Sequence, residues 1–317
     1  MSLRATVFQR TQVGVETTPG TAVAANKQFS SLSIMPKPMV PVTQHRPQGS
    51  KYATAATVGK EHTEARFEGP INYEDLAYIL ASLLAASAYV SPFTFTSALA
   101  GPDSIKTLSI EAGSNVRAEK FAYGVVSDLE LKFTQQDATL SGQMFGRALT
   151  EGATLTASPT VLNNIVVNPK DVSVWVGDTV AGLAEVTKFL EASVSLKGKL
   201  KPAFFFDSSQ TSFTEPVELA PQLSAQVILE HNSVAAGYMA DLRSAKQKFL
   251  RIKALGPVIG AGPDQYTLQI TMPFRFLEND RADSDDIWAS TYNLGPDFET
   301  GLGSPIEIAL TNGLAGL

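Results

Sequence analysis

The sequence predicts a mainly β protein, and three observations support that prediction. Apolar and polar residues alternate with a period of two in several segments, as they do in half-buried antiparallel strands. Charged residues make up only 18% of the 317 residues, while 23 glycines and 18 prolines supply many turns. Only two segments show helical spacing. We therefore expect a β-rich chain with a core built from strand faces.

The clearest alternation lies in residues 128–133, and a predicted partner strand follows at 140–144. The polar residues 135–137 between them are suited to a turn, so this region predicts a β-hairpin. In the second half of the chain, residues 223–230 and 267–272 alternate in the same way. These segments are expected to be antiparallel strands with one face in the core.

The first predicted helix runs from Tyr73 to Leu84, with apolar residues at helical spacing and Asn72 as its N-cap. Glu74 and Asp75 lie in its first turn, where carboxylates are favourable. The second predicted helix covers residues 233–245. Each helix follows a predicted strand and is followed, after a connection, by another strand.

This common order indicates an internal duplication. Setting Gly20 against Gly182 gives a spacing of 162 residues, and at that spacing the strand and helix of each half superpose. The join, near residues 150–170, is rich in small and turn-forming residues. The predicted division is a first unit at 1–155, a second, duplicated unit at 156–286, and a C-terminal arm at 287–317.

The sequence contains no motif for catalysis or for a cofactor. Cysteine is absent, and the three histidines, His45, His62 and His231, are far apart and have no metal-ligand spacing. No phosphate-binding loop or nucleophile elbow occurs. We therefore expect no enzymatic activity, no cofactor and no metal.

Charge and hydropathy exclude two further classes. A net charge of −6 argues against a generally basic, DNA-coating surface. The chain begins without an apolar signal region, and its longest apolar stretch, residues 76–90, is interrupted by polar residues. A soluble protein without a signal peptide is expected.

Three local clusters have both a functional and a simpler interpretation. An acidic group around Arg281 begins a calcium-loop pattern, which Ile287 and Trp288 break, so a solvated acidic loop is favoured. Lys197, Lys199 and Lys201 would share one strand face, where they keep an edge soluble or meet an acidic partner more readily than they bind nucleic acid. The acidic group around Arg281, described first, consists of Glu278, Asp280, Asp283, Asp285 and Asp286.

The run Phe204–Phe206 is too apolar to stay exposed, and either a core or a subunit interface would bury it.

The order of several short motifs resembles the tail tube proteins, or major tail proteins, of long-tailed bacteriophages. The N-terminal run from Gln12 to Ala22 has the pattern G-x-E-T-x-x-G-T. Next come Phe67–Ile71 leading into the first predicted helix, then Phe93–Phe95, and then Lys106–Glu111. The resemblance covers most of residues 8–150, and the repeat extends it to about residue 278. The second half has only an incomplete form of the first run.

The resemblance implies two tandem β-sandwich units of tail-tube type, each with one flanking helix. Such subunits form rings in which strands of neighbours join into a closed inner β-barrel, and the rings stack into a tube for genome ejection. Two units per chain favour rings of three chains with pseudo-six-fold symmetry, with six chains as the alternative. Viral DNA would pass through the lumen without specific binding, because acidic or neutral walls do not attract it.

The same resemblance implies the location and partners of the protein. It would be a virion protein of the phage tail that is assembled in the host cytoplasm, without membrane insertion. Besides further copies of itself, its implied partners are the tape measure protein and tail-terminating proteins. The alternative function is a β-sandwich carbohydrate-binding or adhesin module, which would present exposed aromatic residues; the two tryptophans are Trp175 and Trp288.

Two surfaces are candidates for contacts between subunits. A long polar loop at about residues 40–61 would contact the next ring, or would be a flexible surface loop. The segment after Asp286 would be an extended arm on a neighbour, or a frayed terminus. The loop candidates are Gln44, His45, Arg46, Gln48 and Lys51, and the arm candidates are Trp288, Tyr292 and Leu310.

Overall fold

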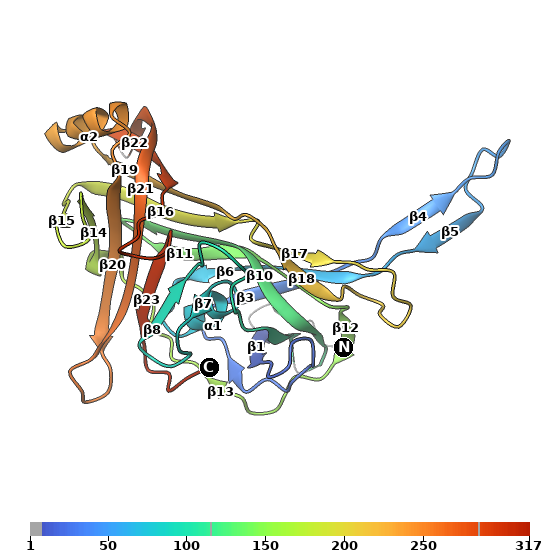
Figure 1. The fold of residues 1–317 in the computed structure, drawn as a ribbon. Coiled ribbons are helices and arrows are strands. Elements are labelled where there is room, and N and C mark those ends of the chain that lie inside the picture. The colour runs from blue at the N-terminus through green and yellow to red at the C-terminus, as the bar shows by residue number, and fades with distance from the viewer. Residues whose placement is uncertain (1–7, 115, 285) are drawn as a thin grey trace.

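The computed structural model describes residues 8–114, 116–284 and 286–317, and it confirms a mainly β fold (Figure 1). Up to residue 153 the elements are β1 (Arg10–Val15), β2 (Lys27–Gln28), β3 (Ser33–Met39), β4 (Val42–His45), β5 (Ala55–Val58), β6 (His62–Pro70), α1 (Asp75–Ala81), β7 (Ala85–Ala86), β8 (Phe93–Thr96), β9 (Leu108–Gly113), β10 (Ala118–Thr134), β11 (Ala138–Gly146) and β12 (Thr150–Ala153). From residue 160 they are β13 (Thr160–Val161), the 3-10 helix η2 (Pro169–Asp171), β14 (Val172–Gly177), β15 (Ala184–Glu185), β16 (Phe189–Lys197), β17 (Leu200–Ala203), β18 (Glu215–Glu218), β19 (Gln222–Glu230), α2 (Ser233–Arg243), β20 (Lys248–Val258), β21 (Gln265–Ser284), β22 (Ile287–Pro296) and β23 (Glu307–Thr311).

One series of antiparallel pairings occurs in both halves of the chain. In the first half, β2 pairs with β1, β1 with β9, β9 with β10, β10 with β11, β11 with β6, and β6 with β3. In the second half, β15 pairs with β14, β14 with β20, β20 with β21, β21 with β22, β22 with β19, and β19 with β16. Each half also has a separate two-stranded hairpin, β4–β5 and β17–β18. The predicted hairpin at residues 128–144 is β10–β11, with its turn at 135–137.

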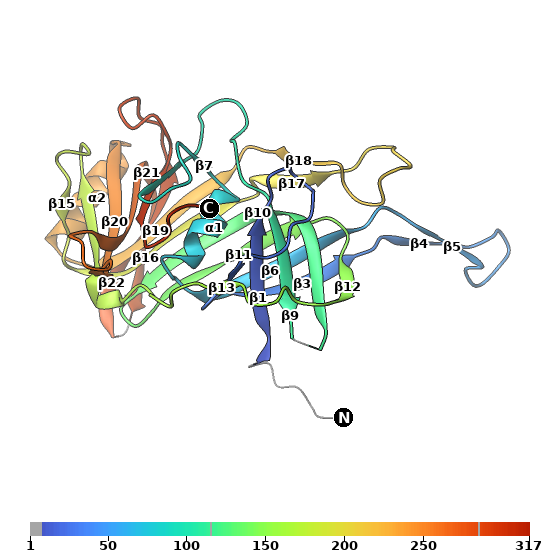
Figure 2. The ribbon, with the colours of Figure 1, turned by 90° about the horizontal axis from the view of Figure 1, so that it is seen from below.

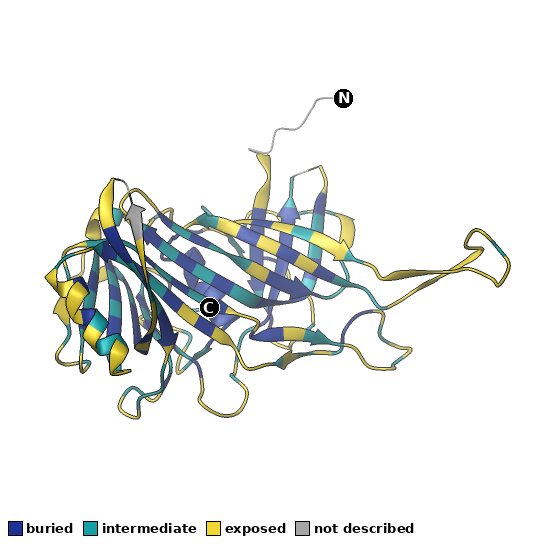
Figure 3. Cartoon of the chain, turned by 90° about the horizontal axis from the view of Figure 1, so that it is seen from above, coloured by how far each residue is buried: buried dark blue, intermediate teal, exposed yellow. Residues whose placement is uncertain are grey.

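Strand β10 also pairs with β16, and this contact joins the two halves into one extended sheet. The order across the sheet is β3, β6, β11, β10, β16, β19, β22 and β21. Figure 3 looks onto this sheet from the side away from α1, and it shows buried positions alternating with less buried ones along the strands. We call the β10–β16 contact the internal seam.

The long strands β10 and β21 each take part in two layers. The first part of β10 pairs with β9, and its last part pairs with β11 and β16. The first part of β21 likewise pairs with β20 and β23, and its last part pairs with β22. The two second layers, around β1–β9 and around β14–β20–β23, lie apart in Figures 1 and 2.

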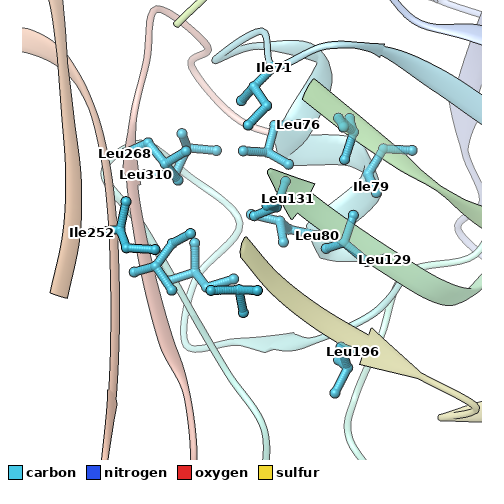
Figure 4. Close-up of a cluster of buried hydrophobic side chains, with 14 of the residues drawn as sticks. Ile71, Leu76, Ile79, Leu80, Leu129, Leu131, Leu196, Ile252, Leu268 and Leu310 are labelled. Carbon is cyan, nitrogen blue, oxygen red and sulfur yellow. The ribbon is translucent and has the colours of Figure 1, made fainter. Parts of the chain in front are cut away.

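The core lies between these layers, and α1 is entirely buried in it. Leu76, Ile79 and Leu80 of α1 face apolar side chains from both halves of the chain (Figure 4). Leu129 and Leu131 of β10 contribute to the same cluster, together with Leu196, Ile252, Leu268 and Leu310. One continuous apolar cluster therefore spans both halves and binds them together.

An asparagine precedes each helix, but only Asn232 is the N-cap of its helix, α2; the N-cap of α1 is Glu74, two residues after Asn72, so the expectation of Asn72 as the N-cap is corrected. The Asn72 Oδ1 accepts the N–H of Glu74 at 2.8 Å, and the Asn232 Oδ1 accepts the N–H of Val234 at 2.9 Å. The two asparagines are 160 residues apart, two fewer than the spacing of 162 at which Gly20 is set against Gly182. Helix α1 is also shorter than expected, because the chain must leave the helix axis to form β7, which pairs with β8.

The segment after residue 286, expected as an extended arm, instead belongs to the sheets. Strand β22 lies between β19 and β21, and β23 pairs with both β21 and β8. The C-terminal strand thus ties the second half to the first. The expectation of an arm that lies on a neighbour is therefore corrected, because β22 and β23 pair with β19, β21 and β8 of their own chain.

Candidate functional site

The extended sheet has one apolar face in the core and one polar face that is open to the outside of the subunit. Residues opposite one another on neighbouring strands share a face, so the pairings define rows across the sheet. Three of these rows are polar apart from Ile228. They are Ser33, Glu68, Ser141, Glu130, Ser195 and Ser224; Thr139, Lys132, Ser193, Gln226, Asn293 and Glu278; and Thr134, Glu191, Ile228, Thr291 and Asp280.

Carboxylates outnumber cations on this polar face, and most of the cations are paired with carboxylates there. Lys132 Nζ lies 2.9 Å from the Glu191 carboxylate, across the internal seam. Lys197 Nζ lies 3.8 Å from Glu130, also across the seam, and Arg66 Nε lies 3.9 Å from Glu68. The face carries no stripe of uncompensated positive charge over these residues, so its attraction for a polyanion is weak.

The internal seam is closed by apolar side chains on the other face of the sheet. Leu129 lies opposite Leu196, and Leu131 lies opposite Val194. All four are at most 4% exposed. The seam therefore combines a two-way hydrogen-bond ladder with buried apolar contacts, which is the usual way to make a strand junction permanent.

The sheet ends on two open edges over the described residues. Strand β3 pairs with β6 and with no other strand there. The last part of β21, beyond Phe274, pairs with β22 on one side only. On its other side, where β20 pairs with the first part of β21, this last part has no partner strand among the described residues. An open edge presents unpaired backbone groups that another strand can meet.

The motif that carries the family resemblance forms a buried polar network around Glu16, which is 3% exposed. Its carboxylate accepts the N–H of Gly20 at 2.7 Å and the N–H of Tyr123 at 2.8 Å. It also accepts the hydroxyls of Thr107 at 2.8 Å and Ser109 at 2.9 Å. Gly20 has φ +78°, which only glycine adopts readily, and Tyr123 has φ 57°. The motif is thus structural: it ties β1 to β9 and β10.

The second half has a different carboxylate at the corresponding turn. Asp178 is half exposed and lies 2.8 Å from Lys246 Nζ and 2.9 Å from Lys248 Nζ. Hydrogen bonds from Lys246 and then Lys248 lower the pKa of the Asp178 carboxyl to about 2. The same turn is therefore held by a surface ion-pair group in one half and by a buried network in the other.

The β4–β5 hairpin projects away from the rest of the molecule (Figure 1). Every residue of both strands is exposed, including the directly opposed Val42 and Val58. The structure brings together all five residues of the predicted contact loop on this hairpin and its tip. Gln44 and His45 are in β4, Arg46, Gln48 and Lys51 lie beyond it, and His45 Nε2 is 2.9 Å from the Thr57 hydroxyl.

The β17–β18 hairpin instead packs on the first half of its own chain. Its Leu200 and Phe213 form a small apolar cluster with Tyr123, Val125 and Phe145. The three lysines near it do not share a strand face, because Gly198, with φ +66°, separates β16 from β17. The sequence pattern of the hairpin did not reveal these apolar partners, because they lie in β10 and β11, far away in the chain.

Lys199 is the lysine whose environment the sequence does not reveal. It is fully buried, and its Nζ donates to the Leu83 carbonyl at 2.6 Å and to the Asp103 carboxylate. The Glu218 carboxylate lies 3.7 Å away. The expected contact with an acidic partner subunit is therefore replaced, for this lysine, by acidic groups of its own chain.

Phe204, Phe205 and Phe206 are exposed to 44%, 53% and 113%, so this run is not in the core. The expectation that a core of the subunit itself would bury the run is therefore wrong. In the acidic group, Glu278 and Asp280 belong to β21, so this region is a strand over its described part; Asp285 lies outside the described residues.

The predicted arm residues have different environments. Tyr292 is 1% exposed and its hydroxyl donates to the Ala235 carbonyl at 2.6 Å. Leu310 is fully buried in β23. Trp288 is 62% exposed. Only Trp288 is therefore free for contact with another molecule, and the expectation for Tyr292 and Leu310 is corrected by their burial within the chain.

A mainly β sandwich with one extended polar sheet face, two open sheet edges and a projecting hairpin has the architecture of a structural, self-associating protein. The family model described as "Phage tail tube protein" matches residues 9–245. The chain belongs to this family of phage tail tube proteins, which makes it a structural component of the virion tail. A search of the curated proteins finds no match. No helix among the described residues is long and apolar enough to cross a membrane.

Proposed function

We propose that this chain is the tube-forming subunit of a long-tailed phage and that its two halves are copies of one sandwich unit. The repeated order of strand pairings supports this duplication, as does the asparagine before each helix, whose side chain accepts the backbone N–H two residues on. The first unit would run over about residues 10–153 and the second over about 160–311. The second unit then includes β22 and β23, which lie in the segment predicted from the sequence to be an arm.

The observation that carries the ring proposal is the internal seam. Within the chain, the end of β10 in the first unit pairs with β16 in the second unit. In the repeated order of strands, β21 of the second unit corresponds to β10, and β3 of the first unit corresponds to β16. We infer that β21 of one subunit pairs with β3 of the next by the same geometry. Three chains would then close a ring of six units, which removes every open edge of the sheet.

Charge complementarity supports this register. In the internal seam Glu130 lies opposite Ser195. The matching positions across the external seam are Asp280 and Lys37, an exposed carboxylate and an exposed cation. Over the described residues Lys37 has no carboxylate within ion-pair distance in its own chain. Ring closure would give it one.

The polar face would line the lumen. Its paired cations and excess of carboxylates suit a channel that DNA crosses without binding, because few counterions would be released by contact with such a wall. The projecting β4–β5 hairpin, with Gln44, His45, Arg46, Gln48 and Lys51, would contact the next ring. The exposed Phe204–Phe206 run and Trp288 are further candidates for such contacts.

As a tube subunit the protein would have a structural role without catalysis. Its partners would be further copies of itself and, at the two ends of the tube, the tape measure protein and tail-terminating proteins. It would be assembled in the host cytoplasm and would act in the virion during genome ejection.

The stoichiometry of a ring tests the proposal directly. Native mass spectrometry and top-view electron microscopy of assembled protein should give three chains and six similar lobes. Rings of six chains would contradict the role given to the second unit. A protein that stays monomeric at every concentration and in the presence of preformed tubes would contradict the proposed function as a whole.

Disulfide crosslinking tests the register, because the chain has no cysteine and thus no background. In the double variant Lys37→Cys/Asp280→Cys, oxidation of assembled rings should link neighbouring chains into dimers and trimers. The matched control is Lys37→Cys/Ser224→Cys, whose second position lies in the middle of the sheet and should give no link. Equal crosslinking of both variants would refute the register.

A further inference from the structure

The open edge of β3 contains two prolines that face outward. Ile34 donates its N–H to the Thr11 hydroxyl at 3.4 Å, so its N–H points away from β6. Backbone groups in a strand alternate in direction, which places Pro36 and Pro38 on the same outward side. Proline has no N–H, so this edge offers carbonyl acceptors but no donors at these two positions.

The chain contains its own comparison for this edge. Phe67 and Val227 are 160 residues apart, as are the two asparagines before the helices. Ile34 of β3 pairs with Phe67, and Ala192 of β16 pairs with Val227, so Ile34 and Ala192 occupy matching places. Two and four residues after Ile34 are Pro36 and Pro38. Two and four residues after Ala192 are Val194 and Leu196, which therefore occupy the matching positions in β16. The edge that is closed within the chain thus has valine and leucine, and the edge that remains open has prolines.

The facing strand differs in the same direction. On β10, Leu129 and Leu131 are at most 4% exposed and close the internal seam. The pairings of β22 give Asn279 and Arg281 as the matching positions on β21. The open edge of β21 thus has polar side chains at the positions where β10 has the leucines that stabilise the internal seam.

The geometry points to a function of these prolines in controlling assembly. The β3 edge accepts hydrogen bonds from β21 of a second copy of this chain but donates none at Pro36 and Pro38. The contact between β3 of one subunit and β21 of the next, the external seam, therefore has hydrogen bonds in one direction only at these positions. Free subunits then associate weakly through their edges, and closure depends on simultaneous contacts elsewhere, such as those of the β4–β5 hairpin with an existing ring. This inference rests on the proposed ring.

The double variant Pro36→Val/Pro38→Val tests the inference. It restores two outward N–H donors, and two added backbone hydrogen bonds should lower the concentration needed for assembly about tenfold or more. The matched control is Pro263→Val in the exposed turn between β20 and β21, which should assemble as the unchanged protein does. Assembly is measured by sedimentation velocity over a dilution series, with electron microscopy of the products.

The outcomes separate this inference from the proposed ring. If the unchanged protein assembles and the folded double variant assembles at the same concentration, the role of the prolines is refuted while the ring proposal stands. If neither assembles even on preformed tubes, the proposed function is refuted and the inference falls with it. The single variants Pro36→Val and Pro38→Val, each expected to give part of the shift, decide the matter where the double variant does not fold.

Discussion

Replacing Glu16 by alanine should strongly destabilise the subunit, because it removes a buried hydrogen-bond acceptor. The Glu16 carboxylate is buried and accepts four hydrogen bonds, two of them from the backbone N–H groups of Gly20 and Tyr123. In the variant these N–H groups have no acceptor at this position. The hydroxyls of Thr107 and Ser109 can rotate toward other acceptors, so they add less to the loss.

The expected loss follows from the two orphaned backbone donors. Each buried N–H left without an acceptor costs about 1–3 kcal/mol. Tyr123 adds to this, because its φ of 57° is unfavourable for a non-glycine residue and is held by its surroundings. We expect a loss of about 3–5 kcal/mol in the free energy of unfolding for Glu16→Ala.

Urea unfolding of the subunit, followed by circular dichroism and fluorescence, measures this loss. The matched control is Glu64→Ala, which removes an exposed carboxylate from the polar face and should change the free energy of unfolding by less than about 0.5 kcal/mol. A loss below about 1 kcal/mol for Glu16→Ala, or equal losses for both variants, would refute the structural role of the motif.

Three further predictions concern a buried charge, a close contact and a surface ion pair. Lys199→Met leaves the Asp103 carboxylate buried without its cation, so the free energy of unfolding should fall by about 3–5 kcal/mol in urea unfolding; an unchanged midpoint would contradict the buried pair. Gly142→Ala places a Cβ against the backbone carbonyl oxygen of Asp128, closer than a normal contact, and should lower stability by about 3 kcal/mol. Gly237→Ala, in an open position of α2, should be neutral or stabilising; similar thermal melting of both variants would count against this packing. The lowered pKa of Asp178, about 2, means that its ion pairs stabilise the fold above the ordinary carboxyl pKa of 3.8 and are lost as the pH falls through about 2; an NMR titration that gives Asp178 a pKa near 4 would refute them.

Local chemistry made several elements predictable. Alternation over residues 128–144 predicted the β10–β11 hairpin because a half-buried antiparallel pair imposes that period. Asn72 predicted the region of α1 but not its first residue: its side chain accepts the N–H of Glu74, and the helix begins only at Asp75. The C-terminal strands were not predictable in the same way, because their partners β8, β19 and β21 are distant in sequence.

The candidate site shows the same division. The five residues of the predicted contact loop could be selected as a polar, extended segment, and the structure places them on one projecting hairpin and its tip; their contact with another ring stays a prediction. Alternation also defined two faces for each strand, but it could not say which face is in the core. That choice depends on α1 and the second layers, which supply the apolar side chains that cover one face and leave the other polar.

The sequence by itself determined that the chain is mainly β, that its halves share an order of elements, and that its motifs resemble those of tail tube proteins. These features depend on neighbours in the chain: side-chain alternation, caps and short motifs. Only the tertiary structure decided that β10 joins β16, that Lys199 and Leu310 are buried, and that β3 and the end of β21 stay open. These are decided by strands far apart in sequence, whose pairing depends on register and burial in the whole molecule.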